Sequence, residues 1–555
     1  MIFMDNKISV IYNNGKKVTV AKNSRIIDIE KELPNDIKTR IVGAKINNTV
    51  VSLDTKLKQD CCINFIDSND LAGYKMYQAG LKFVFLAAMY DVYGKKVDIV
   101  FDHSIMRGMH ITISNLKITN KEIIKIKERM TKIITDDLRI LKMNVLSKEM
   151  VEFYKKEDKI ANCYNVLNID DALVTLYKLE NYFDYFYVEM PYSTGCLKRF
   201  DLVALNEKEI VLLFPTPRSK NEVPSYIHYE KVIDCYKREK NWLNKCDIPY
   251  VYQVNKVVAS GKIKDLIRLS EINYDNKIHE VASKILEKKS KFVMIAGPSS
   301  SGKTTTCKKL SLDLQARGLK TLTISVDDYF KNRVDTPKLP DGRYDFESIA
   351  SIDVENLNRD INDLLAGKEV ELPTYNFVSG VREYIKGKTK ITSDCIILME
   401  GLHCLNDALT PYIDKDIKYK IYLSPFMPLN LDNNNYVSTT DLRLIRRMVR
   451  DNRTRGNDVS KTICSWQDVR SGEEKYIFPY INTSDIIINT SLVYEIGVLK
   501  VFAEPLLYSV GTDSIYYEEA RRLINFLKSY YPISSEYIAE DCVLREFIGG
   551  SCFES

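Results

Sequence analysis

A short run of residues in the second half of the chain constrains the fold more than any other feature. The apolar stretch Phe292–Ala296 is followed by Gly297-Pro-Ser-Ser-Ser-Gly-Lys-Thr304, which fits the pattern G-x-x-x-x-G-K-T. This pattern is typical of a loop between a buried strand and a helix, where backbone N–H groups converge on phosphate oxygens. The helical stretch 305–317 supplies the remaining context. The sequence therefore predicts an α/β fold with a nucleotide site.

The loop residues have separate predicted roles. Lys303 is expected to reach the β- and γ-phosphates of ATP, while backbone N–H groups hold the other phosphate oxygens. The Thr304 hydroxyl is a predicted Mg²⁺ ligand, because this ion prefers oxygen donors. The predicted nucleotide contacts are Gly297, Pro298, Ser299, Ser300, Ser301, Gly302, Lys303, Thr304 and Thr305.

Two acidic residues follow apolar runs downstream of this loop. The run Thr321–Ser325 leads to Asp327, and the run Cys395–Met399 ends in Glu400. Ligands of open parallel sheets bind at the carboxyl ends of strands. Asp327 is therefore a candidate general base for an attacking hydroxyl, and Glu400 is a candidate Mg²⁺ ligand. The alternatives are a helix-capping or metal-shell role for Asp327 and a chance pattern at Glu400.

An arginine-rich segment comes next. Its first four arginines fall largely on one face of a helix that Gly456 ends. Such closely spaced guanidinium groups repel one another unless they face solvent or phosphate, which suits a lid that closes over ATP. A nucleic-acid-binding or simply solvated face is the alternative. The six arginines are Arg443, Arg446, Arg447, Arg450, Arg453 and Arg455.

Aromatic residues with polar neighbours lie between these segments. Asp345 stands between Tyr344 and Phe346, where a carboxylate suits the two hydroxyls of a ribose. The stretch Pro373–Arg382 contains rings that can stack on a base. Either cluster fits an ordinary hydrophobic core equally well when it is considered alone.

The order of these motifs over residues 292–490 resembles that of the uridine kinase and phosphoribulokinase family. The shared segments are G-P-S-S-S-G-K-T, S-V-D-D-Y-F, Y-D-F, P-T-Y-N-F-x-x-x-x-R, E-G and R-R-M-V-R-D-x-x-x-R-G. The resemblance implies phosphoryl transfer from ATP with Asp327 as the catalytic base, together with Lys303, Arg447 and Arg450. It also implies Mg²⁺ at Thr304 and Glu400. The implied substrate contacts are Asp345, Phe330, Tyr375, Arg382 and Arg455.

Two positions depart from the uridine kinase pattern. Those kinases carry a histidine five residues after the stacking tyrosine, where this chain has Gly380. Their lid reads R-G-R-D, whereas this chain has Asn457 in place of the second arginine. Both changes lie on the acceptor or lid side of the site. They leave phosphoryl transfer intact as a prediction and leave the acceptor open.

The first 225 residues have a different character. Residues 1–68 alternate in the manner of a hairpin around Asn13-Asn-Gly15, with a short helix near 25–33, and the layout resembles the TGS domain of threonyl-tRNA synthetases. Residues 69–225 resemble the second additional domain of those enzymes, where an H-x-x-x-H pair begins a metal site. Here His103 is followed by Arg107, and Phe186 and Met190 occupy the later cysteine and histidine positions. A structural role for His103 is therefore favoured over zinc.

The whole chain divides into five predicted regions. These are a β-grasp domain (1–68), an α+β domain (69–225), a helical connector (226–290), a P-loop domain with helices on both faces of a parallel sheet (291–505) and a helical tail (506–555). The twelve cysteines are scattered without a C-x-x-C pair, as is usual for reduced cytoplasmic proteins. No stretch is expected to span a membrane.

The predicted function is an ATP- and Mg²⁺-dependent small-molecule kinase, with the 5′-hydroxyl of a nucleoside such as uridine as the favoured acceptor. The alternative is an RNA- or tRNA-associated regulatory ATPase that uses the synthetase-like first half. The acidic residues Asp327 and Glu400 favour the enzyme. A small-molecule substrate is the expected partner, and RNA and a homo-oligomer are left open.

Overall fold

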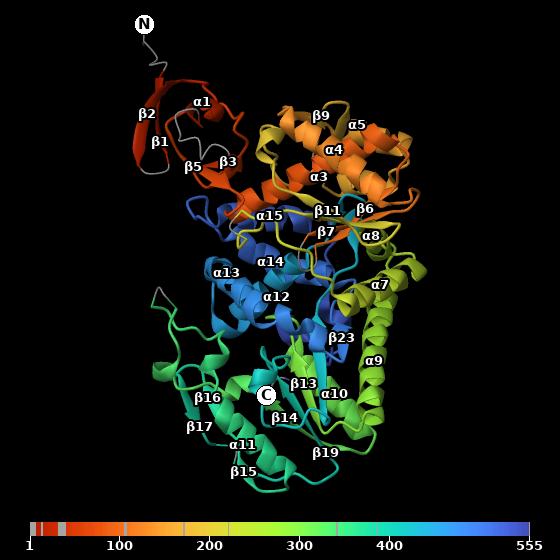
Figure 1. The fold of residues 1–555 in the computed structure, drawn as a ribbon, viewed down its shortest axis with the longest axis vertical. Helices are drawn as coiled ribbons and strands as arrows, with labels where there is room; N and C mark the ends of the chain where they lie inside the picture. Colours follow the sequence, from red (N-terminus) through yellow and green to blue (C-terminus); the bar gives the residue numbers. More distant parts are fainter. Residues whose placement is uncertain are drawn as a thin grey trace.

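The computed structural model describes residues 7–12, 15–30, 40–104, 108–169, 172–219, 221–339, 342–385 and 387–553. Figure 1 shows the synthetase-like first half at one end of the molecule and the parallel sheet of the second half at the other. Helices from the last third of the chain lie between them.

The first module is a five-stranded sheet with the strand order β2-β1-β5-β3-β4. Strands β1 and β2 pair antiparallel, which confirms the hairpin, and β1 pairs parallel with β5. The turn residues Asn13 and Asn14, and residues 31–39 of the predicted helix, lie outside the described residues. The elements are β1 (Lys7–Tyr12), β2 (Lys16–Ala21), α1 (Ile26–Glu30), β3 (Ile41–Ile46), β4 (Thr49–Val51) and β5 (Cys61–Asp67).

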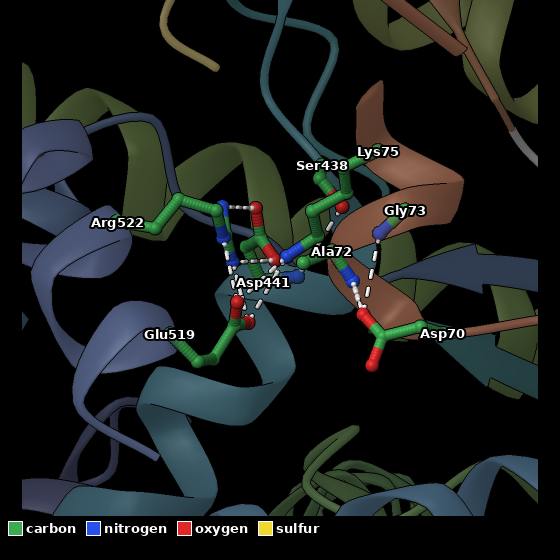
Figure 2. Close-up of polar contacts among 8 residues, drawn as sticks. All are labelled: Asp70, Ala72, Gly73, Lys75, Ser438, Asp441, Glu519 and Arg522. Atoms are coloured by element: carbon green, nitrogen blue, oxygen red, sulfur yellow. Dashed lines mark hydrogen bonds and ion pairs between the residues drawn. The ribbon is translucent and has the colours of Figure 1, made fainter. Parts of the chain in front are cut away.

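The second module is an α+β domain built around a buried helix, α3 (Leu71–Tyr93). The Asp70 carboxylate caps this helix by accepting hydrogen bonds from the N–H groups of Ala72 and Gly73, as Figure 2 shows. Helix α3 packs between a four-stranded and a three-stranded sheet, which explains why it is apolar nearly all round. No helix in the described part of the chain is long and apolar enough to cross a membrane.

The four-stranded sheet has the order β11-β12-β7-β6, and the three-stranded sheet has the order β10-β9-β8. Helix α4 packs on α3, and its buried residues belong to the same core. The elements are β6 (Ile99–His103), β7 (Met109–Ile113), α4 (Asn120–Thr135), β8 (Leu141–Leu146), α5 (Ser147–Lys156), α6 (Ile160–Ile169), β9 (Leu173–Leu179), β10 (Tyr182–Tyr185), β11 (Asp201–Ala204) and β12 (Glu209–Leu213).

The predicted connector consists of three helices, α7 (Glu230–Lys245), α8 (Val251–Ala259) and α9 (Ile263–Glu287). It does more than join two domains. The buried face of α9, including Ile278 and Ile285, belongs to the same hydrophobic core as strand residues Val293 and Ile295. Helix α7 packs on the opposite face of the sheet. The connector therefore forms part of the layers that cover the parallel sheet.

Five parallel strands in the order β14-β19-β13-β20-β23 form the sheet of the second half. Alternate residues face two separate cores: Val293 and Ile295 lie on one side, and Phe292 and Met294 lie on the other. Helices therefore cover both faces, which confirms the predicted fold class. The strands are β13 (Phe292–Ala296), β14 (Lys320–Ser325), β19 (Cys395–Glu400), β20 (Lys418–Ser424) and β23 (Ile486–Asn489).

The remaining elements frame this sheet. Helix α10 begins at the phosphate-loop lysine and packs against α9. The elements are α10 (Lys303–Ala316), α11 (Val354–Leu365), β15 (Val370–Glu371), β16 (Thr374–Asn376), β17 (Val381–Glu383), β18 (Lys388–Thr389), β21 (Asn430–Asp432), β22 (Asn435–Tyr436), α12 (Thr439–Arg455), α13 (Val459–Tyr476), α14 (Glu495–Tyr508), α15 (Tyr517–Lys528) and α16 (Arg545–Ile548).

A half-buried ionic network joins the two halves of the molecule (Figure 2). Lys75 on α3 pairs with Glu519 on α15 at 2.9 Å. Arg522 pairs with Glu519 at 2.8 Å and with Asp441, in the first turn of α12, at 2.7 Å. The first half is thus bonded to the start of the helix that carries the arginine-rich segment.

Candidate active site

The phosphate loop has the tight geometry that its glycines predict. A Cβ atom at Gly297 would lie 2.5 Å from Ser301 Oγ and 2.8 Å from the Leu423 carbonyl oxygen. Gly302 has a φ of 83°, and Ser300 also has a positive φ, of 60°. Left-handed residues of this kind turn successive N–H groups toward one side of a loop.

The carbonyl oxygens of the loop are bound from outside. This leaves the N–H groups on the other side, where phosphate oxygens can accept from them. The donors are Arg443 Nε to the Ser299 oxygen (3.0 Å), Arg446 Nη1 to the Ser300 oxygen (3.4 Å) and Thr490 Oγ1 to the Ser301 oxygen (2.7 Å).

Arg443 and Arg446 are therefore scaffold residues of the phosphate loop, and not part of a mobile lid. Both are buried, at 2% and 0% exposure. Arg443 pairs with Glu473, and Arg446 pairs with Glu495 at 2.7 Å. The sequence analysis expected the arginine-rich segment to face solvent or phosphate as a lid, whereas Arg443 and Arg446 each face a buried carboxylate that neutralises their charge.

The other arginines of α12 surround a single acid. Asp451 is paired with Arg447 at 3.2 Å, with Arg450 at 2.8 Å and with Arg455 at 3.7 Å. Arg447 Nη1 also donates to Ser299 Oγ in the phosphate loop at 2.8 Å. Three cations share one carboxylate, so these four side chains carry a net positive charge beside the loop. Such an arrangement stabilises the negative charge of a phosphoryl group during its transfer.

Asp327 and Glu400 lie at the carboxyl ends of neighbouring strands, since Ser325 of β14 pairs with Glu400 of β19. Burial raises the pKa of Asp327, and the nearby cations Lys303 and Arg455 oppose this effect. Burial raises the pKa of Glu400 to about 7, again against the influence of Lys303. Both carboxylates are thus close to the phosphate-loop lysine. This is the proximity that their strand positions predicted.

An aromatic cluster lies beside Asp327. The Phe330 ring is 5.9 Å from Phe346, 5.5 Å from Tyr375 and 6.3 Å from Phe377, centroid to centroid. Tyr375 is fixed through its backbone N–H, which donates to Asp328 Oδ1 at 3.2 Å. The two aromatic motifs of the sequence therefore form one cluster, while Phe346 and Phe377 keep exposed surface for a ligand.

On the acceptor side, Arg382 keeps the family pattern and Gly380 departs from it. Arg382 pairs with Asp353 at 2.9 Å, and its Nη1 atom is buried without a hydrogen-bond partner among the described residues. A Cβ atom at Gly380 would lie 2.7 Å from Arg333 Nε. The Arg333 guanidinium thus fills the space that a histidine at position 380 would need.

The sequence analysis missed two residues on the acceptor side of the site, His403 and Glu347. His403 Nε2 is 3.0 Å from the Glu347 carbonyl oxygen, and its Nδ1 is buried without a described partner. Burial lowers the pKa of His403 to about 4, so the ring is neutral and the free Nδ1 is an acceptor. The only signal in the sequence is that His403 stands three residues after Glu400.

Glu347 offers a pH-dependent test of this pocket. Burial, and then the nearby Glu473, raise its pKa to about 7 from an ordinary value of 4.5. The folded pKa is the higher one, so the stability that protonated Glu347 contributes is present below the unfolded pKa and lost as pH rises through 7. We expect Glu347→Gln to raise the thermal unfolding midpoint over wild type increasingly as pH rises from about 5 to about 8.

Differential scanning calorimetry of both proteins across this range measures the effect. Glu355→Gln is the control, because Glu355 is an exposed glutamate on α11. A difference between Glu347→Gln and wild type that stays constant with pH would contradict the raised pKa.

The synthetase-like half carries a buried pair of histidines. The rings of His103 and His110 stack at 4.2 Å, and Tyr236 contacts His103 at the same distance. Burial lowers the pKa of both histidines. No group of three or more metal-binding side chains occurs within the described ranges, and Arg107 lies outside them. The geometry agrees with the structural interpretation of His103.

The fold and the site define a P-loop phosphotransferase of the α/β class. Residues 292–496 match the phosphoribulokinase / uridine kinase family. A uridine kinase of Macrococcus caseolyticus is 31% identical over 219 residues, which cover 38% of this chain and 96% of that enzyme. A uridine kinase of Mycoplasma genitalium is 28% identical over 226 residues, which cover 40% of this chain and 97% of that enzyme. The chain belongs to this family and has the ATP-dependent kinase domain that defines it.

The first half is related to a different group of proteins. Residues 8–67 match the TGS domain. A threonine–tRNA ligase of Thermotoga neapolitana is 26% identical over 203 residues, which cover 36% of this chain and 31% of the ligase. The predicted fusion is thereby confirmed. The chain spans less than a third of the ligase, so the ligase reaction itself is not carried over.

Proposed function

We propose that this chain transfers the γ-phosphate of ATP to the 5′-hydroxyl of a nucleoside such as uridine. One observation carries the proposal. The Lys303 cation of the phosphate loop is close enough to the carboxylate of Asp327 to oppose the rise of its pKa, and Asp327 stands three residues before Phe330 of the aromatic cluster. A base in this position can serve a hydroxyl brought in by the aromatic cluster while the phosphate is held by the loop.

Asp327 acts as the general base. The acceptor hydroxyl loses its proton to a carboxylate oxygen of Asp327 while its oxygen bonds to the γ-phosphorus. The bond from the γ-phosphorus to the β,γ-bridging oxygen breaks, and ADP leaves. Burial raises the pKa of Asp327 and so its affinity for the proton, and the Lys303 cation opposes this effect.

Thr304 and Glu400 have the chemistry that Mg²⁺ requires. The Thr304 side chain is exposed at the start of α10, and the half-buried Glu400 carboxylate accepts a hydrogen bond from Ser325 Oγ at 3.3 Å. Burial raises the pKa of Glu400 to about 7, and a cation bound at this carboxylate would lower it. The bound ion would offset negative charge on the phosphates. Few protein ligands are needed, because Mg²⁺ keeps water and phosphate oxygens in its shell.

Arg447, Arg450 and Arg455 balance the charge of the transferring group, since they share only Asp451 among them. On the acceptor side, Phe330 and Tyr375 border the base and Asp345 receives the ribose hydroxyls. Arg382 has a buried Nη1 atom without a hydrogen-bond partner among the described residues, and this donor could serve a ligand oxygen. Arg333, in the space above Gly380, supplies a cation where uridine kinases have an imidazole.

A panel of hydroxyl acceptors with radiolabelled ATP tests the proposal. Uridine and cytidine are expected to yield a labelled 5′-monophosphate, and their 5′-deoxy analogues should yield none. If ATP turnover is independent of every small acceptor and increases only with added RNA, the kinase proposal is wrong and a regulatory ATPase is favoured.

A further inference from the structure

The C-terminal segment (residues 540–553) lies directly against the phosphate loop and the first turns of α10. Figure 1 shows the C-terminal end of the chain beside β13 and α10. Lys309 pairs with Asp541 at 2.6 Å, and Lys308 Nζ donates to the Phe553 carbonyl oxygen at 2.5 Å. A Cβ atom at Gly302 would lie 2.4 Å from Val543 Cγ2. The sequence predicted no chemical role for this tail.

One carboxylate of this segment binds donors that a nucleotide phosphate would otherwise use. Glu546 Oε2 accepts hydrogen bonds from the Thr305 backbone N–H at 3.3 Å and from Thr305 Oγ1 at 2.8 Å. Thr305 is 3% exposed, so its donors face the protein and not solvent. In a phosphate loop, the free N–H groups at the start of the helix are the donors that nucleotide phosphate oxygens take. A carboxylate is the closest protein counterpart of that anion.

The backbone around Glu546 is anchored independently of this contact. Val543, Leu544 and Phe547 are fully buried. Arg453 Nη2 donates to the Glu546 carbonyl oxygen at 3.2 Å, and the Arg446 guanidinium lies 4.8 Å from the centre of the Phe547 ring. The Glu546 side chain itself is only half-buried. It can therefore rotate away from Thr305 while the segment stays folded.

We propose that Glu546 is a residue of the nucleotide site that competes with nucleotide phosphate for Thr305. This inference rests on the nucleotide binding of the proposed function. It adds that a bound nucleotide displaces the carboxylate, so Glu546 sets the affinity for ATP and ADP. The two anions exclude each other because they need the same donors, and because like charges repel at this distance.

Titration calorimetry of the full chain with ADP and Mg²⁺ tests this competition. Glu546→Gln keeps the size of the side chain and removes its charge. Glu546→Asp keeps the charge and shortens the reach to Thr305. Both variants are expected to bind ADP about tenfold more tightly than wild type. This change in affinity corresponds to the contribution of about one charge-assisted hydrogen bond. Glu540→Gln, an exposed carboxylate at the start of the same segment, should bind ADP like wild type.

Unchanged or weaker ADP binding in either Glu546 variant would overturn the inference. If Glu546→Gln does not fold, as judged by its thermal unfolding midpoint, Glu546→Asp decides alone. Lys303→Ala separates this inference from the proposed function. Lost ADP binding in Lys303→Ala, with no change in the Glu546 variants, rejects only the competition. Absent ADP binding in wild type and all variants rejects the nucleotide site itself.

Discussion

Asp327→Asn is expected to lower kcat by about 10²- to 10⁴-fold, the usual contribution of a positioned general base. An asparagine keeps the size and the polarity of the side chain but cannot take the proton from the acceptor hydroxyl. ADP affinity should stay within about twofold of wild type, because Asp327 acts on the acceptor oxygen and the phosphate contacts come from the loop. Initial rates at saturating ATP and acceptor, with calorimetric titration of ADP, measure both effects.

Asp335→Asn is the matched control for this experiment. Asp335 is an exposed acid eight residues further along the chain, so the same change of charge is made outside the site. Its kcat should remain that of wild type. A kcat of Asp327→Asn close to that of the control would show that the base is another residue. A parallel loss of ADP binding would instead indicate that Asp327 organises the nucleotide site.

The fold was predictable because its signals are local. Residues 292–304 combine a buried strand, a glycine loop and a helix start within one short stretch, and the later apolar runs Thr321–Ser325 and Cys395–Met399 have the length of buried parallel strands. The alternation of Phe292 and Val293 between two cores follows from strand geometry alone. The order of the strands is not local, and the sequence analysis did not predict it.

The spacing of the arginines in the sequence does not show which of them are structural and which can bind phosphate. Arg443, Arg446 and Arg447 share one helical face. Arg443 and Arg446 are buried scaffold residues, whereas Arg447 shares its acid with two other arginines and can bind phosphate. The difference lies in partners far along the chain: Glu473, thirty residues from Arg443, and Glu495, forty-nine residues from Arg446. A buried carboxylate decides whether an arginine is structural or available.

The same limit applies to the acceptor pocket and to the tail. His403 meets Glu347 across fifty-six residues, and Glu546 meets Thr305 across 241. No periodicity in the sequence brings such pairs together. The boundaries of the five predicted regions share this limit, since α9 reads as a connector and yet contributes to the core of the parallel sheet.

Arg446→Met is expected to destabilise the second half by about 3–5 kcal/mol, the cost of breaking a buried ion pair. Glu495 is fully buried and would be left without its counter-ion, so it would be either charged and unpaired or protonated at a cost. Arg446 Nη2 also donates to the Thr490 carbonyl oxygen at 2.9 Å, so a second buried polar group would lose its partner. The thermal unfolding midpoint measures this loss. Lys284→Met, which breaks an exposed pair with Glu280, should cost less than about 1 kcal/mol.

The double variant Arg446→Met with Glu495→Gln separates stability from function. Glutamine removes the uncompensated charge and can still accept the bond from the Leu492 N–H, which Glu495 Oε1 accepts at 2.9 Å. Most of the lost stability should therefore return. ADP binding should stay weaker than in wild type, because the Ser300 carbonyl oxygen has lost the donor that holds the phosphate loop open. Full recovery of ADP binding would mean that this arginine serves only the core. A double variant as unstable as Arg446→Met would mean that the guanidinium contributes mainly through its bonds to the Ser300 and Thr490 carbonyl oxygens and not through the ion pair.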